Sequence, residues 1–272
     1  LGCGRTGEEM NGWGLKSDKA RQDIWDQIPE RLRQVGATCY RLPWTTEDIR
    51  GFVISTLKAG RGTWVIGVVG AVAEFTAAAG TDVQVRVKGD EITAFTRNGA
   101  IRMTINEGVR ALTFDPPGLM REPRIVLAVT RENGRLPVTN DATDLGIDAS
   151  ALWAEPDTKL YDLGLGRKEG RFCVRVGSGD AQTALNRAQG IPFRQALPMI
   201  GGALIAERPT RVVESVLGRI EVKGQIPPPT AKSPDGPHTH LLPDHLETER
   251  ALPIGMDLPR AYLPGAIFYP PK

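Results

Sequence analysis

The sequence predicts an α+β protein of two mixed lobes, each an antiparallel meander with helices on one face, closed by an extended proline-rich C-terminal strap. Three observations predict this class. A few segments carry apolar residues at helical spacing. Short segments of alternating polarity follow one another at hairpin spacing in both halves of the chain. Eleven of the 21 prolines lie after residue 226, and a proline offers no N–H to a sheet.

Changes in composition divide the chain into four parts. Residues 1–16 are glycine-rich and are expected to form a flexible lead. The chain loses its periodicity around residues 131–143, which predicts a boundary between an N-terminal α+β lobe over 17–135 and a C-terminal α+β lobe over 145–226. The strap over 227–272 is expected to pack on the body, because its apolar and aromatic residues argue against a solvated linker.

Two helices are expected at the start of the N-terminal lobe. Apolar spacing predicts the first over residues 17–35, although Pro29 should kink or split it. In the second, Thr45 or Thr46 is a candidate N-cap, acidic residues suit the first turn, and Gly60 suits the end. The buried face of this second helix would hold Ile49, Phe52, Val53 and Leu57.

Strands are expected to fill the rest of the N-terminal lobe. The sequence predicts a strand over 63–69 and a short alanine-rich helix near 71–79. DVQVRVK (82–88), EITAFT (91–96) and AIRMTI (100–105) are alternating segments separated by turn signals, which predicts an antiparallel meander with one wet face. VRALTF and RIVLAVT would extend it.

The C-terminal lobe is expected to begin with a hairpin formed by TKLYDLGLG (158–166) and RFCVRV (171–176). Ser178 is a candidate N-cap for a helix that ends at Gly190. A second helix over 193–207 should bend, since it contains Pro198 and a glycine pair. Residues 210–226 alternate like a pair of strands with a bulge or bend at Gly218.

Composition and charge exclude several classes of protein. The chain is 40% hydrophobic and 24% charged, which is ordinary for a soluble globular protein. Its net charge is +2 with the signs interspersed, so no basic face for nucleic acid is expected. No apolar run is long enough to cross a bilayer, and no membrane partner is expected.

The three cysteines, Cys3, Cys39 and Cys173, are far apart and include no CxxC pair. This argues against a disulfide framework and fits the reducing cytoplasm. The chain starts at Leu1 rather than Met, which leaves open a preceding segment such as a signal sequence.

Four segments carry a resemblance to known sequences: GTWVIGVVGAVAEF (62–75), LYDLGLGRKEGRFCVRV (160–176), LGRIEVKGQIPPP (217–229) and SPDGPHTHLLP (233–243). Together they resemble a family of uncharacterised bacterial proteins, found mainly in proteobacterial genomes. The resemblance covers most of the chain after about Gly60, and the ending PRAYLPGAIFYPPK departs from it. It implies a bacterial, cytoplasmic protein, and it implies no activity and no catalytic residue.

All three histidines lie within eight residues, in DGPHTHLLPDHLE (235–247). If His238 and His240 lie in an extended segment, their imidazoles share one side, because strand side chains repeat every second residue. PDHLETER is typical of a short helix, in which His245 and Glu249 are four residues apart on one face. Three imidazoles and a carboxylate suit zinc, iron or nickel. These four residues are therefore the predicted metal ligands.

Two carboxylates of the body, Asp162 and Glu221, are candidates to complete the set, because both lie in strands that we expect to be neighbours. The alternative interpretation is structural. In it, His238 and His240 donate hydrogen bonds to carbonyls that the surrounding prolines leave unpaired.

The leading functional hypothesis is a non-catalytic binding or accessory protein that presents these histidines to a metal ion or metal-containing ligand. A second is a metal-dependent hydrolase or oxygenase, in which the histidines hold an activated water. A third is a structural or partner-docking protein without a small-molecule site. The sequence indicates no catalytic residue and no organic cofactor, since GVVG (67–70) lacks the full glycine fingerprint and the P-loop lysine. The only cofactor it suggests is a divalent transition metal.

Overall fold

The structure is a computed structural model that describes residues 6–10, 15–34, 39–68, 71–77, 80–115, 122–132, 134, 136–166, 170–224, 236–240 and 261–271. Its elements, in chain order, are α1 (Gly7–Met10), α2 (Asp18–Gln34), β1 (Tyr40–Arg41), α3 (Thr46–Lys58), β2 (Thr63–Val68), β3 (Ala71–Thr76), β4 (Gln84–Lys88), β5 (Glu91–Phe95), β6 (Gly99–Thr104), β7 (Val109–Thr113), β8 (Ile125–Thr130), β9 (Thr143–Ile147), β10 (Lys159–Asp162), β11 (Arg171–Val176), α4 (Asp180–Arg187), α5 (Phe193–Glu207), β12 (Thr210–Glu214), β13 (Gly218–Val222), β14 (His238–His240) and β15 (Tyr262–Tyr269).

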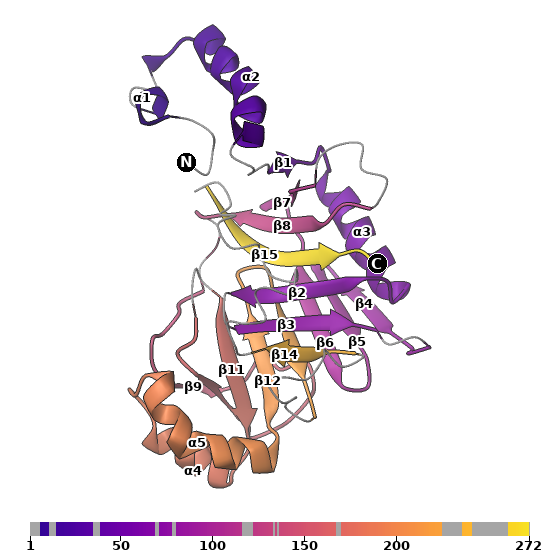
Figure 1. Cartoon of the computed structure of the whole chain (residues 1–272). Helices are drawn as coiled ribbons and strands as arrows, with labels where there is room; N and C mark the ends of the chain where they lie inside the picture. Colours follow the sequence, from indigo (N-terminus) through magenta and orange to yellow (C-terminus); the bar gives the residue numbers. More distant parts are fainter. Residues whose placement is uncertain are drawn as a thin grey trace.

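The strands form two antiparallel sheets (Figure 1). Sheet A has the order β1-β7-β8-β15-β2-β3-β14, and sheet B has the order β4-β5-β6-β13-β12-β11-β10-β9. The strands of sheet A run across those of sheet B, and β2 and β3 contact β11, β12 and β13 of the facing sheet. The expected α+β class is therefore confirmed.

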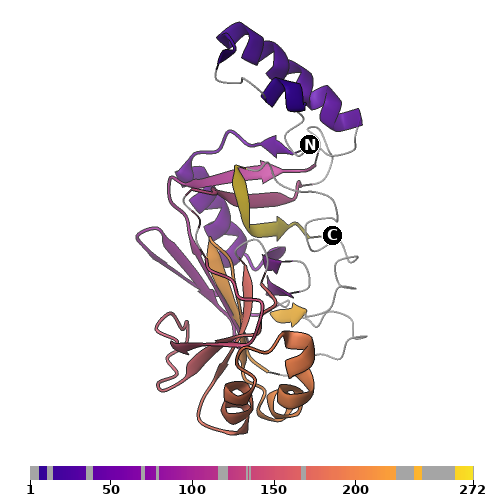
Figure 2. The same ribbon diagram turned by 90° about the vertical axis from the view of Figure 1, so that its left-hand side faces the viewer.

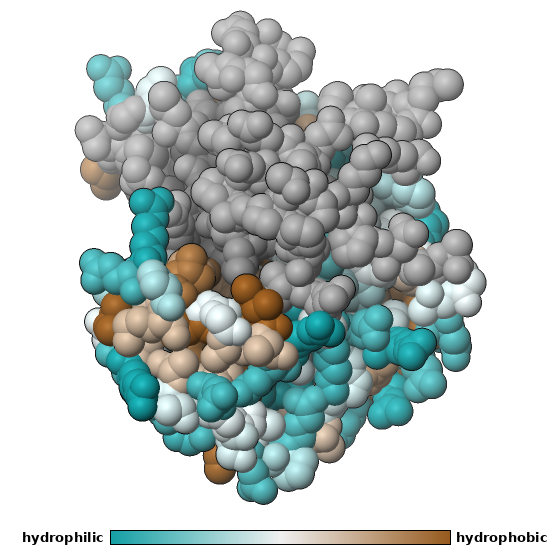
Figure 3. Space-filling view, turned by 60° about the horizontal axis from the view of Figure 1, so that its bottom comes forward, coloured by the Kyte–Doolittle hydropathy of each residue, from teal (hydrophilic) through white to brown (hydrophobic). Residues whose placement is uncertain are grey.

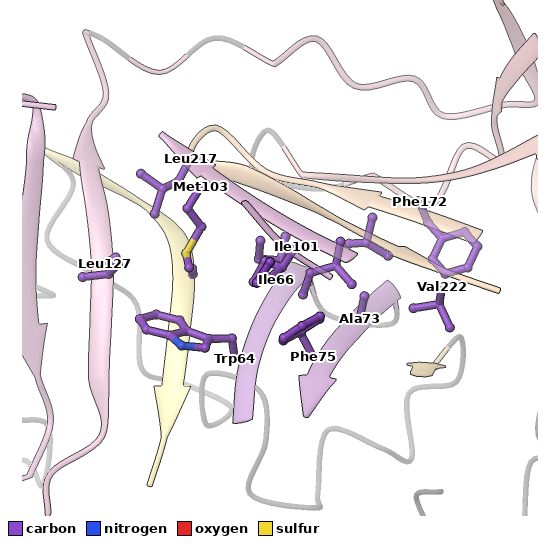
Figure 4. Packing of buried hydrophobic residues seen from close by; sticks show 14 of the residues in the cluster. Trp64, Ile66, Ala73, Phe75, Ile101, Met103, Leu127, Phe172, Leu217 and Val222 are labelled. Atoms are coloured by element: carbon purple, nitrogen blue, oxygen red, sulfur yellow. The ribbon is translucent and has the colours of Figure 1, made fainter. Parts of the chain in front are cut away.

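The main hydrophobic core lies between the two sheets (Figure 4). Phe268 of β15 contacts Trp64 of β2 and Phe52 of α3, with ring centroids 5.2 and 5.1 Å apart. Alternation along each strand supplies the other inward side chains, which include Ile66, Ala73, Phe75, Ile101, Met103, Leu127, Phe172 and Val222, and Leu217, just before β13, joins them.

Helix α3 forms where the local signals predict it. Thr45 is its N-cap, and a capping box joins Thr45 to Asp48, which satisfies backbone N–H groups that have no partner inside a helix. Gly60 follows its end with φ +57°, a backbone conformation that favours glycine. The predicted inner face is confirmed, with Ile49, Val53 and Leu57 buried and Phe52 half-buried.

Helices α4 and α5 pack on each other at the end of the molecule opposite α1 and α2 (Figure 2). The prediction that Ser178 caps α4 is wrong, because the N-cap is Gly179 and makes no side-chain cap. Instead, Glu207 of α5 accepts a hydrogen bond of 2.9 Å from the N–H of Ala181. One backbone N–H in the first turn of α4 is therefore satisfied by the neighbouring helix.

The predicted helix near 71–79 is wrong, because residues 71–76 form strand β3, which pairs with β2. Alanine favours helices only weakly, and tertiary pairing overrides that preference. The burial of this segment has a period of two: Ala73 and Phe75 belong to the core between the sheets, while Val72 packs in a separate apolar cluster on the other face.

The two predicted lobes do not correspond to the two sheets. Strand β6 from the first half of the chain pairs with β13 from the second half inside sheet B. Strands β7 and β8, expected to extend the meander of β4 to β6, pair with each other in sheet A instead. Hairpin spacing predicts that neighbours in sequence pair, but it contains no information about which sheet receives the next hairpin.

The proline-rich tail is expected to be an extended strap outside any sheet, but two of its segments are strands of sheet A. Residues 238–240 form β14 at the edge of sheet A, and β15 lies in the centre of that sheet between β8 and β2. Pro264 is tolerated inside β15 because the register with β8 shifts between Pro264 and Ala266. An irregularity of this kind is where a strand admits a residue without an N–H.

The N-terminal segment is more helical than expected. Helix α1 lies within the predicted flexible lead, and α2 runs through Pro29 without being split in two. In the described part of the chain, no helix has both the length and the apolar character needed to span a bilayer.

Candidate metal-binding site

Strand β14 carries the first two of the predicted ligands. Its backbone is extended, which meets the condition under which His238 and His240 share one side, and it pairs with β3 so that His238 lies opposite Glu74 and His240 opposite Val72. The entry to β14 is fixed by close packing: a Cβ on Gly99 would lie 2.2 Å from the Cβ of Pro237. Only glycine at position 99 leaves room for this proline.

The imidazole of His238 is held at both nitrogens. Nδ1 lies 2.8 Å from the carbonyl oxygen of Gly236, and because a carbonyl only accepts hydrogen bonds, Nδ1 carries a hydrogen. Nε2 lies 3.2 Å from Oε2 of Glu74, and both side chains are buried, with 3% and 1% of their surface exposed. The expectation that a backbone carbonyl binds the His238 ring therefore holds for Nδ1, while Nε2 faces a carboxylate.

The next residue, Thr239, connects β14 to the other sheet. Its hydroxyl accepts a hydrogen bond of 2.8 Å from Nε of Arg211 in β12, and Nη1 of the same arginine donates to the carbonyl of Gly224 at 2.8 Å. Burial lowers the pKa of Arg211 to about 10, so the guanidinium stays cationic at neutral pH. Strand β14 is thus bonded to sheet A through its backbone and to sheet B through Thr239.

The remaining predicted ligands are not brought together by the described residues. The side chain of His240 and the whole of His245 and Glu249 lie outside them. Across the described ranges, no group of three or more His, Cys, Asp or Glu side chains is arranged to hold a metal ion.

The two body carboxylates, Asp162 and Glu221, are on sheet B and do not approach His238. They lie in one row across the sheet, because Glu221 pairs with Val212, Val212 with Cys173, and Cys173 with Asp162. Three strand spacings of about 4.8 Å therefore separate them, and one ion cannot bind both.

Glu221 instead belongs to a buried ionic network on the outer face of sheet B. Its two carboxylate oxygens lie 2.8 Å from Arg175 and 2.8 Å from Arg219, and Asp148 bridges the same two arginines from the other side. The side chains of these four residues are at most 2% exposed. Two arginines and two carboxylates thus form a closed, charge-balanced ring.

The segment after β9, residues 148–158, covers this ring. Asp148 comes from it, and the N–H of Leu152 donates to Glu221 at 2.9 Å. Glu155 binds Arg175 at 2.9 Å and Lys223 at 2.5 Å. The Trp153 ring packs against Phe95 and lies 4.5 Å from the Lys223 ammonium.

Burial alone would raise the pKa of Asp148, but the hydrogen bonds and charges of Arg219 and Arg175 outweigh it and lower the pKa. Burial alone would lower the pKa of Arg175 and of Arg219. The charge of Glu221 raises both, and the net result is a raised pKa for each arginine. Asp148, Arg175 and Arg219 are therefore held in the ionised form. The ring has no net charge left for a ligand, and its chemistry is that of a structural ion network.

Asp162 has a different environment. It accepts a hydrogen bond of 2.9 Å from the N–H of Gly164, and burial raises its pKa above the usual value. The carboxyl group of Asp162 therefore binds its proton more tightly in the native state than in the unfolded state. As the pH rises from the unfolded pKa through the folded pKa, ionisation of Asp162 lowers the stability of the fold.

We expect Asp162→Asn to remove this pH-dependent loss. Urea unfolding between pH 4 and 7, the range above the unfolded pKa of about 3.9, should show the variant gaining stability relative to the wild type as the pH rises. Asp82→Asn, at an exposed position, is the matched control and should show no such trend. A stability difference between Asp162→Asn and wild type that is constant with pH contradicts the expectation.

An open groove of about 800 Å³ lies at the N-terminus of α3, lined by Trp44, Arg50, Asp90 and Arg110 among others. Its arginines are engaged within the protein. Arg50 donates to Asp90 and to the carbonyls of Gly89 and Ile105, and Arg110 donates to the carbonyls of Glu107 and Val109. The groove therefore offers less to a charged ligand than its composition suggests.

Sequence reasoning missed Glu74. The signal was present, since Glu74 is the only charged residue in the apolar run 63–75, and a carboxylate in such a run has a buried partner as a rule. The residue that pairs with it lies more than 160 positions further along the chain, which no local pattern indicates.

Comparison with known proteins identifies a family. The model of a family described as a family of unknown function (DUF6925) matches residues 48–272, which extends the resemblance noted from about residue 60. No curated protein and no solved structure matches the chain.

Proposed function

The chain belongs to DUF6925, a family of unknown function, and from the contacts of His238 we propose that it is a non-catalytic metal-binding protein. His238 and Glu74 would supply the first two ligands of a divalent transition metal. His240, His245 and Glu249 are the source of the others. The carrying observation is the approach of the His238 Nε2 to the Glu74 carboxylate.

The orientation of the imidazole supports this proposal. A metal-bound histidine commonly donates its second N–H to a carbonyl or carboxylate, which fixes the ring and its tautomer. In His238, Nδ1 is bonded to the carbonyl of Gly236, and Nε2 is the nitrogen directed at the carboxylate. His240 is two residues further along the same strand, a position that shares a face with His238.

The distance between the two donor atoms is also suitable. Two ligands 3.2 Å apart, each bound to one ion at about 2.0 to 2.2 Å, subtend an angle of about 100° at the metal, near the tetrahedral value. The same distance fits a direct ion pair between a protonated His238 and Glu74. The experiment below separates the two.

Burial favours a binding role over the hydrolase or oxygenase alternative. A catalytic metal keeps an open position for water or substrate, whereas a structural site is closed. His238 and Glu74 are both almost fully buried. A metal here would fasten β14, and through the Thr239–Arg211 contact it would connect the two sheets.

The test is metal uptake by protein purified without a histidine tag. We expect about one zinc, iron or nickel ion per chain and a higher melting temperature with metal, because a ligand that binds only the native state stabilises it. Glu74→Gln and His238→Gln should each lose both effects. Glu47→Gln, whose carboxylate is 88% exposed, is the control and should keep both.

Two results would count against the proposal. Wild-type protein that binds none of the three metals leaves His238 and Glu74 as an ion pair. Metal uptake that persists unchanged in Glu74→Gln places the ion elsewhere.

We further infer a reducing compartment such as the bacterial cytoplasm. Cys39 and Cys173 are free thiols, and burial raises the pKa of Cys39 to about 11 and that of Cys173 well above its usual value. Both thiols are therefore protonated and unreactive at neutral pH. Alkylation of the denatured protein directly after cell lysis should modify both, and a blocked thiol would argue for another compartment.

A further inference from the structure

The residues on either side of His238 contact a different sheet from the one that His238 contacts. Pro237, just before β14, packs against Gly99 of β6, and Thr239 is bonded to Arg211 of β12. Both β6 and β12 belong to sheet B. His238, between them, faces Glu74 of sheet A. The place of the His238 ring therefore depends on contacts that its two neighbours make with sheet B.

Strand β14 is too short to be fixed by its backbone pairing alone. It has three residues, and within the described ranges it pairs with β3 on one side and forms the edge of sheet A. A strand of this length is at the lower limit for globular proteins, and an edge segment with few backbone hydrogen bonds opens locally at little cost. Side-chain contacts must supply the rest of its stability.

The first of these contacts is made by Arg211. In the strand register Arg211 lies opposite Val174 and Val222, which both belong to the core between the sheets. Its side chain therefore enters this space from sheet B, and it is buried there. The bond of 2.8 Å from its Nε to the hydroxyl of Thr239 has a charged donor, which makes it stronger than a bond between neutral groups.

The second contact is made at Gly99. A Cβ at this position would lie 2.2 and 2.3 Å from the Cβ and Cγ of Pro237. Gly99 is not among the glycines with positive φ, so the backbone itself would accept alanine here. Strand β13 lies between β6 and β12, and Gly99 and Arg211 thus hold the segment on both sides of β13.

We propose that Gly99 and Thr239 are positioning residues of the metal site. Neither contacts the ion, and together they hold β14 where Nε2 of His238 stays beside the carboxylate of Glu74. This inference rests on the proposed function, because it takes His238 and Glu74 as ligands. Residues that orient metal ligands strengthen binding, since the ligands are already in place when the ion arrives. Sheet B thereby sets the affinity of a site whose first two ligands lie in sheet A.

The coupling acts in both directions. If the bond between Thr239 and Arg211 raises the affinity for the ion, the ion must stabilise that bond by the same factor. Metal binding should therefore tighten the connection between the two sheets, and a variant without the bond should gain less thermal stability from added metal.

The test is titration of the metal-free protein with zinc in competition with a chelator of known affinity; iron or nickel replaces zinc if the uptake experiment identifies that ion. Thr239→Val keeps the shape of the side chain without its hydroxyl and should bind zinc about 10- to 100-fold more weakly. Thr239→Ser keeps the hydroxyl and should restore most of the affinity. Gly99→Ala should weaken binding to a similar extent, because its methyl group displaces Pro237.

Gly202→Ala is the matched control for the added methyl group. Gly202 lies in α5, at the end of the molecule that is turned forward in Figure 3, and no atom lies within 4 Å of the position that a Cβ would take. The variant should bind zinc like the wild type. It should melt no lower, because alanine favours helix more than glycine does.

Melting of the metal-free proteins separates positioning from stability, and every titration is made well below the lowest melting temperature. A purely structural contact would lower the melting temperature and leave the zinc affinity of the folded protein unchanged. If Thr239→Val does not fold, Gly99→Ala carries the test.

Three results would overturn the inference. Wild-type affinity in the folded Thr239→Val and Gly99→Ala variants rejects positioning and leaves the metal site standing. A loss of affinity that Thr239→Ser shares shows that the hydroxyl is not the cause. A wild type that binds none of the three metals removes the metal site and this inference with it.

Discussion

Glu221→Gln is expected to lower the free energy of unfolding by about 3 to 5 kcal/mol, the range observed when one charged partner of a buried ion pair is removed. The loss of one negative charge leaves Arg175 and Arg219 with only part of their compensation, and the side chains of both arginines are at most 1% exposed. Glutamine preserves the size of the side chain, so packing is not the cause. Urea unfolding at neutral pH measures the effect.

Glu91→Gln is the control for this experiment. Glu91 is 45% exposed and lies 3.8 Å from Arg102 on the same sheet, and an exposed pair of this kind contributes about 0 to 1 kcal/mol. Equal effects of the two variants would show that the ring is not isolated from water. In addition, Glu221→Gln combined with Arg219→Met should destabilise by less than the sum of the two single variants, because the two residues are in contact.

Removal of β15 is expected to abolish the native fold. Strand β15 pairs with β8 on one side and β2 on the other, so a chain that stops at residue 260 splits sheet A, leaves one edge of β8 and one edge of β2 unpaired, and removes Phe268 from the core. The truncated protein should lack a cooperative thermal transition. Circular dichroism and urea unfolding test this directly.

A point variant in β15 allows the contribution of this strand to stability to be measured in a protein that still folds. Phe268 is fully buried, and Phe268→Ala should lower the free energy of unfolding by about 3 to 5 kcal/mol. As a control, removal of residues 1–10 takes a similar length from the other end and should have a much smaller effect, since the described contact it removes is one partly exposed ion pair between Glu9 and Arg31. A truncated chain that melts cooperatively near the wild-type temperature would contradict the central role of β15.

Elements with local signals were predictable from the sequence. The cap at Thr45, the acidic first turn and the stop at Gly60 place α3 correctly, because each of them acts within one helical turn. The meander of β4 to β6 and the hairpin of β10 and β11 follow from turn residues between alternating segments. The extended backbone of His238 to His240 follows from the prolines that precede it.

Elements that depend on distant residues were not predictable. Alternation of Arg171, Arg175, Arg219 and Glu221 with apolar residues reads as a wet face of a sheet, and it becomes a buried network only because residues 148–158 cover it. Similarly, the proline content of the tail predicts that it avoids sheets, whereas β15 occupies the place between β8 and β2. In both cases the information lies in a segment far away in the chain.

The position of β15 also has a consequence for biosynthesis. Strands β2 and β8 emerge from the ribosome well before β15, the strand that separates them in sheet A. During translation each therefore has an edge with unpaired N–H and C=O groups, which can pair with another chain. We expect the nascent polypeptide to depend on chaperones until residues 262–269 have emerged, and then to fold slowly, because its closing contacts join sites far apart in sequence.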